Sequence, residues 1–215
     1  MTLLIPTAYL PPVSYLGAVL QAGSVVMEYF ETYQKQTCRN HCVIYGPNGR
    51  QVLSVPVSKV NGNHTLTRDI RISGQRGWQQ IHWRSIETAY NNSPFFLYYR
   101  DYLEPFYFKN HPYLIDLNLD LLQALFQMLN AKVGIAFTSK FETHPAGVTD
   151  CRQTAVSKHI TSTFNIPHYH QVFEPAHGFL TNLSALDLIF NLGPEAISYL
   201  QKLNVKPGFG PAALA

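Results

Sequence analysis

Charged side chains are scarce in this sequence, and long apolar runs are missing from it. Asp, Glu, Lys and Arg make up 13% of the 215 residues, roughly half their share in an average soluble domain. The basic residues are scattered and the net charge is only +3, whereas nucleic-acid-binding proteins carry a dense basic stripe. No stretch approaches the roughly 18 apolar residues that a membrane-spanning helix needs. We therefore expect neither nucleic acid as a partner nor insertion into a membrane.

Cysteine and the familiar catalytic motifs are also scarce. Three cysteines cannot all pair, so a disulfide framework is not expected. The first residues lack a basic n-region and are interrupted by Pro6, Pro11 and Pro12, which argues against a secretion signal and favours a cytoplasmic protein. The chain has no GxGxxG fingerprint, Walker loop, GxSxG elbow, HExxH or paired CxxC motif. No metal site is predicted, and the cofactor is unknown from the sequence.

Aromatic residues, by contrast, are plentiful. They make up 13% of the chain, with 13 Tyr and 13 Phe. Many tyrosines with little charge favour an extensive interior, a sticky surface patch or an oligomer interface, so a homodimer is one expectation. The length suits one well-buried domain.

Hydrophobic periodicity predicts a mixed α/β fold. We expect one domain over residues 1–203, with N-terminal strands and a hairpin followed by a mainly helical second half, and a loosely held tail over residues 204–215. Predicted strands cover residues 3–9, 25–30, 37–45, 50–57, 66–73 and 137–141, with an extended stretch at 169–173. Predicted helices cover residues 14–21, 78–89, 93–106, 116–130, 151–158, 182–191 and 194–203.

The predicted hairpin carries an unusual polar cluster. Pro47-Asn48-Gly49 supplies the turn, because Asn-Gly tolerates the positive φ of tight hairpins. Its first strand contains Arg39, Asn40 and His41, of which Arg39 and His41 share one face. A guanidinium has donors suited to carboxylate or phosphate, so one interpretation is an anion clamp. The alternative is an exposed strand in which Arg39 pairs with a carboxylate such as Asp69.

Two polar residues lie on predicted apolar helix faces. His82 is in line with Trp78 and Ile86, and is either a general acid or base at a pocket or a core histidine bonded to a carbonyl. Asp187 is on the line of Leu183 and needs a cation or several donors to remain ionised. Arg39 or Arg152 are candidate cations. A cysteine nucleophile, Cys38 or Cys151 with a distant histidine, is a further alternative.

Several stretches of this sequence resemble one protein family. They include Thr7-Ala8-Tyr9-Leu10-Pro11-Pro12, Tyr33-Gln34-Lys35-Gln36-Thr37-Cys38-Arg39-Asn40, Arg68-Asp69-Ile70-Arg71-Ile72, Trp78 with His82, Ala89-Tyr90 with Pro94-Phe95-Phe96, Tyr169-x-Gln171-x-Phe173, and Asn182-Leu183-Ser184 through Asn191-x-Gly193-Pro194-Glu195. Together they identify a resemblance to the WbqC-like protein family over about residues 3–200. The family usually has His-Gln-Pro ahead of the tyrosine, where this chain has Ile5-Pro6-Thr7.

The resemblance implies surface polysaccharide biosynthesis of the O-antigen type. The expected activity is that of a transferase that moves an acyl or aminoacyl group onto an amino sugar, with a small-molecule sugar or acyl donor as partner. In this interpretation His82 is the general base and Asp69 orients it. Tyr9, Arg39, Asn40, His41 and Asp187 form the ligand site, and Arg39→Ala is expected to abolish turnover while sparing stability. The alternative is a non-catalytic binding or scaffold module, suggested by the missing histidine and the many tyrosines.

Overall fold

A parallel sheet of four short strands lies at one end of the computed structural model, which describes residues 1–74, 77–153 and 166–204. Its strands are β1 (Thr2–Ile5), β2 (Ser24–Met27), β7 (Ile135–Phe137) and β8 (Thr149–Asp150), in the order β7-β2-β1-β8. All three pairings are parallel. The sheet therefore unites two strands from the start of the chain with two that follow more than a hundred residues later.

The parallel sheet has a position at which the sequential order of its strands reverses. Taken in chain order, the strands read 3-2-1-4, so β1 and β8 are the neighbours at which the order reverses. Ligands of open α/β sheets bind outside the carboxyl ends of the strands at such a point. The helix α1 (Val13–Gln21) connects β1 to β2. The carboxyl ends of β1, β2, β7 and β8 are followed by Pro6, Glu28, Thr138 and Cys151.

The two faces of this sheet have different surroundings. Side chains alternate between the faces of a strand, and Leu3, Ile5, Val25 and Met27 belong to the main hydrophobic core. Leu4 and the half-buried Val26 lie on the other face and are not part of that core cluster. This second face is the floor of a cavity described below.

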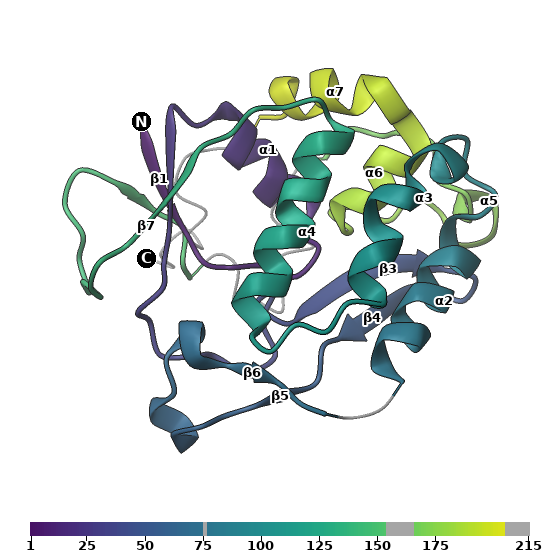
Figure 1. The fold of residues 1–215 in the computed structure, drawn as a ribbon. Helices are drawn as coiled ribbons and strands as arrows, with labels where there is room; N and C mark the ends of the chain where they lie inside the picture. Colours follow the sequence, from purple (N-terminus) through teal and green to yellow (C-terminus); the bar gives the residue numbers. More distant parts are fainter. Residues whose placement is uncertain (75–76, 154–165, 205–215) are drawn as a thin grey trace, which may run out of the picture.

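The predicted hairpin is present. Strands β3 (His41–Gly46) and β4 (Gly49–Ser54) pair antiparallel around Pro47 and Asn48, and Gly49 has a φ of 94°. A positive φ is readily adopted by glycine because it has no Cβ atom. A second, shorter antiparallel pair joins β5 (Val57–Ser58) to β6 (Arg71–Ile72). Figure 1 shows both pairs apart from the parallel sheet, with β5 and β6 along the lower edge.

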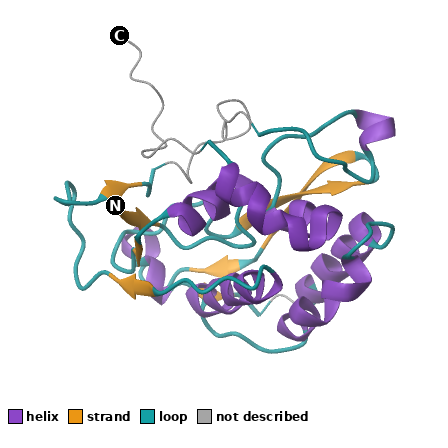
Figure 2. Ribbon diagram, turned by 90° about the horizontal axis from the view of Figure 1, so that it is seen from above, coloured by secondary structure: helices purple, strands orange, loops and turns teal. Residues whose placement is uncertain are grey.

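Helices cover the hairpin and the core. Figure 1 shows the long helix α4 near the centre with α3 beside it, and Figure 2 shows the helices grouped together from above. Their apolar stripes supply most of the buried leucines and aromatics. Their bounds are α2 (Trp78–Tyr90), α3 (Phe96–Leu103), α4 (Leu114–Met128), α5 (Glu174–His177), α6 (Ala185–Leu192) and α7 (Ala196–Lys202). None of the helices described has both the length and the apolar character required to cross a bilayer.

The α/β class and the single mixed domain are confirmed, but several predicted elements differ. Residues 66–73 form a 3-10 turn (Thr67–Asp69) and the two-residue strand β6. Loop residues provide the backbone hydrogen bonds there, since Thr67 N donates to Glu31 O and Leu114 N donates to Ile70 O. The strand pairing therefore does not extend beyond the two residues of β6. Ser93 donates its hydroxyl to Tyr90 O at the end of α2 and does not cap α3. Residues 169–173 form no strand. The predicted helix 151–158 and tail 204–215 lie mostly outside the described residues.

Candidate functional site

A cavity of about 430 Å³ lies beside the start of the hairpin. We call it the basic cavity. Two segments build it: the loop before β3 together with the first residue of β3, and the region of β5. Its lining comprises Tyr33, Lys35, Gln36, Asn40, His41, Val57 and Lys59. The volume lies within the range of about 300–1,000 Å³ that is usual for small-molecule sites.

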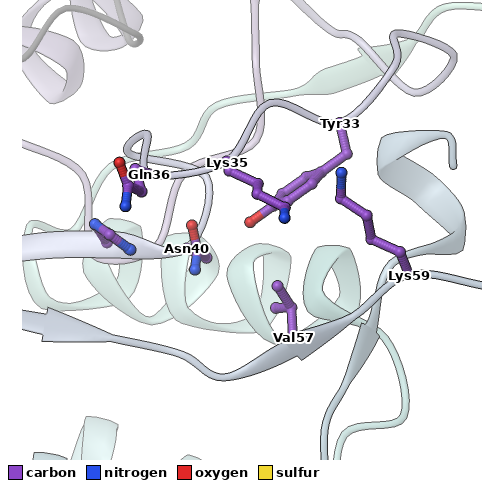
Figure 3. Close-up of a pocket in the computed structure, with 7 residues that line it drawn as sticks. Tyr33, Lys35, Gln36, Asn40, Val57 and Lys59 are labelled. Carbon is purple, nitrogen blue, oxygen red and sulfur yellow. The ribbon is translucent and has the colours of Figure 1, made fainter. Parts of the chain in front are cut away.

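Two residues that line this cavity each carry a buried polar atom without a partner. The Tyr33 hydroxyl and the Asn40 Oδ1 make no hydrogen bond to any described part of the protein, although these residues are only 4% and 6% exposed. The Asn40 amide nitrogen donates to Val55 O at 3.0 Å, which fixes Oδ1 as the unused end. Figure 3 shows the Tyr33 hydroxyl directed toward Asn40. An unpaired buried polar atom costs about 1–3 kcal/mol, so a ligand that supplies partners is favoured here.

The charge of the basic cavity has one sign. Lys35 and Lys59 both line the cavity beside Tyr33 (Figure 3), and the Lys59 ammonium lies 5.9 Å from the centroid of the Tyr33 ring. No carboxylate is among the described residues that line it. Burial lowers the pKa of His41, which keeps its imidazole neutral at pH 7 and able to accept a proton. The cavity therefore offers two cations, a neutral base and two unused polar atoms.

Arg39, expected in the ligand site, is fully buried beneath this region. Its Nε and Nη2 each lie 2.7 Å from a Glu31 carboxylate oxygen, and neither residue is more than 3% exposed. Its Nη2 also donates to Arg152 O at 3.3 Å. The expectation that Arg39 and His41 share a strand face is wrong, because residues 38–40 form a turn and β3 begins at His41. The guanidinium of Arg39 therefore binds protein groups, the Glu31 carboxylate and the Arg152 carbonyl oxygen.

A second buried ion pair is adjacent. Arg152 Nη1 lies 2.9 Å from Glu28 Oε2, and Arg152 Nη2 lies 2.6 Å from Asp150 Oδ2. Glu28 is fully buried and also accepts from the Thr138 hydroxyl. Since the Arg152 carbonyl accepts from Arg39, the two ion pairs form one continuous cluster. We call Glu28, Glu31, Arg39 and Arg152 the buried charge cluster, and the exposed Asp150 lies at its edge.

Tyr9 and His82 meet in the core. The Tyr9 hydroxyl lies 2.8 Å from His82 Nδ1 and 2.9 Å from the Tyr107 hydroxyl. Burial lowers the pKa of His82 to about 4, against the opposing effect of a hydrogen bond with the Ser54 backbone. His82 is therefore a neutral and weak base, and it is not among the residues that line the basic cavity. This geometry matches the alternative of a core histidine.

Asp69 does not contact His82. It lies in the 3-10 turn between β5 and β6, where its carboxylate is 3.7 Å from Arg68 Nε and 46% exposed. His82 is instead held by Tyr9 and Ser54. The predicted orienting contact, and the alternative pairing of Asp69 with Arg39, are both wrong because the predicted strand over residues 66–73 does not form.

Asp187 is buried on α6 with neutral partners. Its Oδ2 accepts from the Tyr169 hydroxyl at 2.7 Å and from the Gln171 amide at 2.8 Å. The predicted ion pair with Arg39 or Arg152 is wrong, since both arginines belong to the buried charge cluster. Burial raises the pKa of Asp187 to about 6, although hydrogen bonds from Tyr169, Gln171 and Tyr90 oppose the rise.

This pKa predicts a pH-dependent stability that Asp187→Asn should remove. The folded state holds the proton up to about pH 6 and the unfolded state only to about 3.9. The free energy of unfolding therefore falls as pH rises through this window, by about 3 kcal/mol. Denaturant unfolding should show that the free energy of unfolding of the variant, relative to that of the wild type, rises by about 3 kcal/mol between pH 4 and pH 7. A constant difference between the two proteins would mean that the carboxyl titrates normally.

Five residues of the basic cavity were not predicted from the sequence, namely Tyr33, Lys35, Gln36, Val57 and Lys59. Tyr33 to Gln36 appeared only as part of the family resemblance, and nothing in the spacing of Lys59 marks it. Their proximity depends on the pairing of β5 with β6 and on a loop in which Gln36 has a positive φ of 56°. Cys38, a candidate nucleophile, has its pKa raised to about 12 by burial, which disfavours the reactive thiolate.

The fold and the basic cavity define an α/β protein with a ligand-sized cationic recess beside a hairpin. The chain belongs to the WbqC-like protein family, whose model matches residues 7–163. Membership suggests a role in polysaccharide-related biosynthesis. The chain is also similar to the "Uncharacterized protein Rv1507c" of Mycobacterium tuberculosis, with 26% identity over 224 residues, 92% of this chain and 96% of that one. No solved structure matches it.

Proposed function

We propose that this protein is a transferase of surface polysaccharide biosynthesis that moves an acyl or aminoacyl group onto a phosphate-linked amino sugar. The observation that carries this proposal is the basic cavity, in which the buried Tyr33 hydroxyl and Asn40 Oδ1 have no partner in the described protein. Membership of the WbqC-like family supports the pathway.

The chemistry of the cavity fits a ligand that has both an anion and hydroxyl groups. The Lys35 and Lys59 ammonium groups suit a phosphate or diphosphate. Asn40 Oδ1 is an acceptor and needs a hydroxyl or N–H donor, which a sugar supplies. The Tyr33 hydroxyl can donate to a ring or hydroxyl oxygen. A sugar joined to phosphate combines these features in one molecule.

The transfer step uses His41 as the proton acceptor. The amino-sugar nitrogen attacks the carbonyl carbon of the acyl donor, and a C–N bond forms. The bond between that carbon and the donor's sulfur or phosphate oxygen breaks, and the electron pair leaves with the leaving group. The proton on nitrogen passes to the neutral imidazole of His41, which then returns it to the leaving group. The donor is a thioester or an acyl phosphate.

Binding of an anionic sugar should depend on the two lysines. We expect UDP-glucosamine and inorganic pyrophosphate to bind the wild type in isothermal titration calorimetry. Lys35→Gln and Lys59→Gln should each weaken binding about tenfold, since a charge-assisted hydrogen bond contributes about 1.5–3 kcal/mol. Lys202→Gln, at an exposed position on α7, is the matched control and should bind like the wild type. Equal affinities for all variants would place the ligand elsewhere.

A non-catalytic binding module is the second candidate. It is favoured by the enclosure of His82 between Tyr9 and the Ser54 backbone and by Ile5-Pro6-Thr7 at the family's His-Gln-Pro position. Mass spectrometry separates the two functions. The wild type is incubated with UDP-glucosamine and a panel of acyl-CoA thioesters, acyl phosphates and aminoacyl donors. An acylated sugar indicates a transferase, whereas tight binding of the sugar without product from any donor indicates a module.

A further inference from the structure

A second cavity lies at the carboxyl ends of the parallel strands. It has a volume of about 280 Å³, and residues adjoining β1, β2, β7 and β8 contribute to it. We call it the sheet-end cavity. It occupies the place where the order of the strands reverses, which is the usual ligand position of open α/β sheets.

The floor of the sheet-end cavity is apolar and its walls are charged. Leu4 and Val26 project from the sheet face that lies outside the main core cluster. Glu28 and Arg152 of the buried charge cluster line one wall. Lys140 and Glu142, from the loop after β7, line the rim. The four charged groups sum to zero, unlike those of the basic cavity.

The rim ion pair is exposed and can open at little cost. Lys140 Nζ lies 2.9 Å from Glu142 Oε1, and the two side chains are 74% and 46% exposed. Exposed pairs of this kind contribute only about 0–1 kcal/mol. A ligand carboxylate can replace Glu142 beside the ammonium, and a ligand ammonium can replace Lys140 beside the carboxylate. Glu28 is held by Arg152 at 2.9 Å, and the same guanidinium also pairs with Asp150 at 2.6 Å, so the groups of this wall are already occupied by one another.

We propose that the sheet-end cavity binds a small zwitterion, a free α-amino acid with an apolar side chain. One carboxylate and one ammonium match the rim, and the side chain rests on Leu4 and Val26. Because the Asp150 carboxylate also pairs with Arg152, three carboxylates and two cations lie around this space, which disfavours a phosphate dianion. Binding is independent of whether the basic cavity supports transfer, so this site can be tested without turnover.

The experiment is calorimetry on the full chain with L-alanine, L-leucine and L-phenylalanine. At least one should bind, and its amide and its N-acetyl derivative, which each lack one charge, should bind at least tenfold more weakly. The double variant Lys140→Gln/Glu142→Gln should also lose at least tenfold, while Lys202→Gln should match the wild type. Pyrophosphate at 1 mM, a probe of the basic cavity, should leave the affinity unchanged.

Four results would overturn the proposal. They are no binding of any of the three amino acids at 10 mM, equal binding of the singly charged derivatives, unchanged affinity in the double variant, and competition by pyrophosphate. Competition by pyrophosphate would indicate that the amino acid binds in the basic cavity instead. Circular dichroism of the double variant checks its fold, and both substitutions are at exposed positions.

Discussion

Replacement of Arg39 by alanine should destabilise the protein by about 3–5 kcal/mol, because it leaves a buried carboxylate without its cation. Glu31 is 3% exposed and receives two hydrogen bonds of 2.7 Å from the guanidinium. For a chain of this size the melting temperature should fall by roughly 6–20 °C. Denaturant and thermal unfolding at pH 7 measure both quantities.

Two further variants make this prediction specific to the ion pair. Arg39→Met/Glu31→Leu removes both charges and should recover most of the lost stability, since apolar residues of similar volume can replace a buried pair. Arg84→Ala, at an exposed position on α2, should change the free energy of unfolding by less than about 0.5 kcal/mol. If Arg39→Ala kept its stability and lost ligand binding, the guanidinium would be a ligand contact after all, as the sequence suggested.

Replacement of His41 by glutamine should lower turnover by about 10²–10⁴-fold, the usual contribution of a general base. Glutamine keeps a polar side chain at the wall of the basic cavity but cannot accept the proton. UDP-glucosamine should therefore bind the variant within about threefold of the wild type, while the rate of acylated-sugar formation falls. The measurement is single-turnover kinetics beside calorimetry.

The pH profile separates this role from mere positioning. Burial lowers the pKa of His41, so the active, neutral form persists below the ordinary histidine value of about 6.5. The wild-type rate should stay level below that pH and then decline with further acidification, and the residual rate of the variant should lack this decline. His82→Asn is the contrasting change. It should reduce stability through the Tyr9 contact, and its folded fraction should retain turnover. The His41 hypothesis fails if His41→Gln turns over normally.

Several helices and the hairpin were predictable because hydrophobic periodicity and turn residues can be recognised within one short segment of the sequence. The apolar stripes of α2, α4 and α6 and the turn residues of the β3–β4 hairpin placed those elements within a few residues of their observed bounds. The parallel sheet was not predictable in the same way. Its strands have two to four residues, and β8 has only Thr149 and Asp150, too few to show any alternation. Their pairing depends on contacts between distant parts of the chain.

The candidate site was only partly predictable for a related reason. A polar residue type does not reveal whether its partner is a ligand or another side chain. Arg39 and Asn40 are neighbours in sequence, yet one is saturated by Glu31 and the other keeps an unused acceptor in a cavity. Tyr9 and His82 do meet, but in a closed hydrogen-bonded chain with Tyr107. Lys59 reaches the basic cavity only through the short pairing of β5 with β6.

The ion pair between Glu28 and Arg152 also constrains the order of events during synthesis. The two residues are 124 positions apart in the chain, so Glu28 leaves the ribosome long before its cation exists. Until then the carboxylate is more stable in water than in the interior, and the nascent N-terminal strands cannot settle around it. Completion of this part of the molecule therefore waits for the segment that contains β8, so the strands that are made first are not the first to reach their final surroundings.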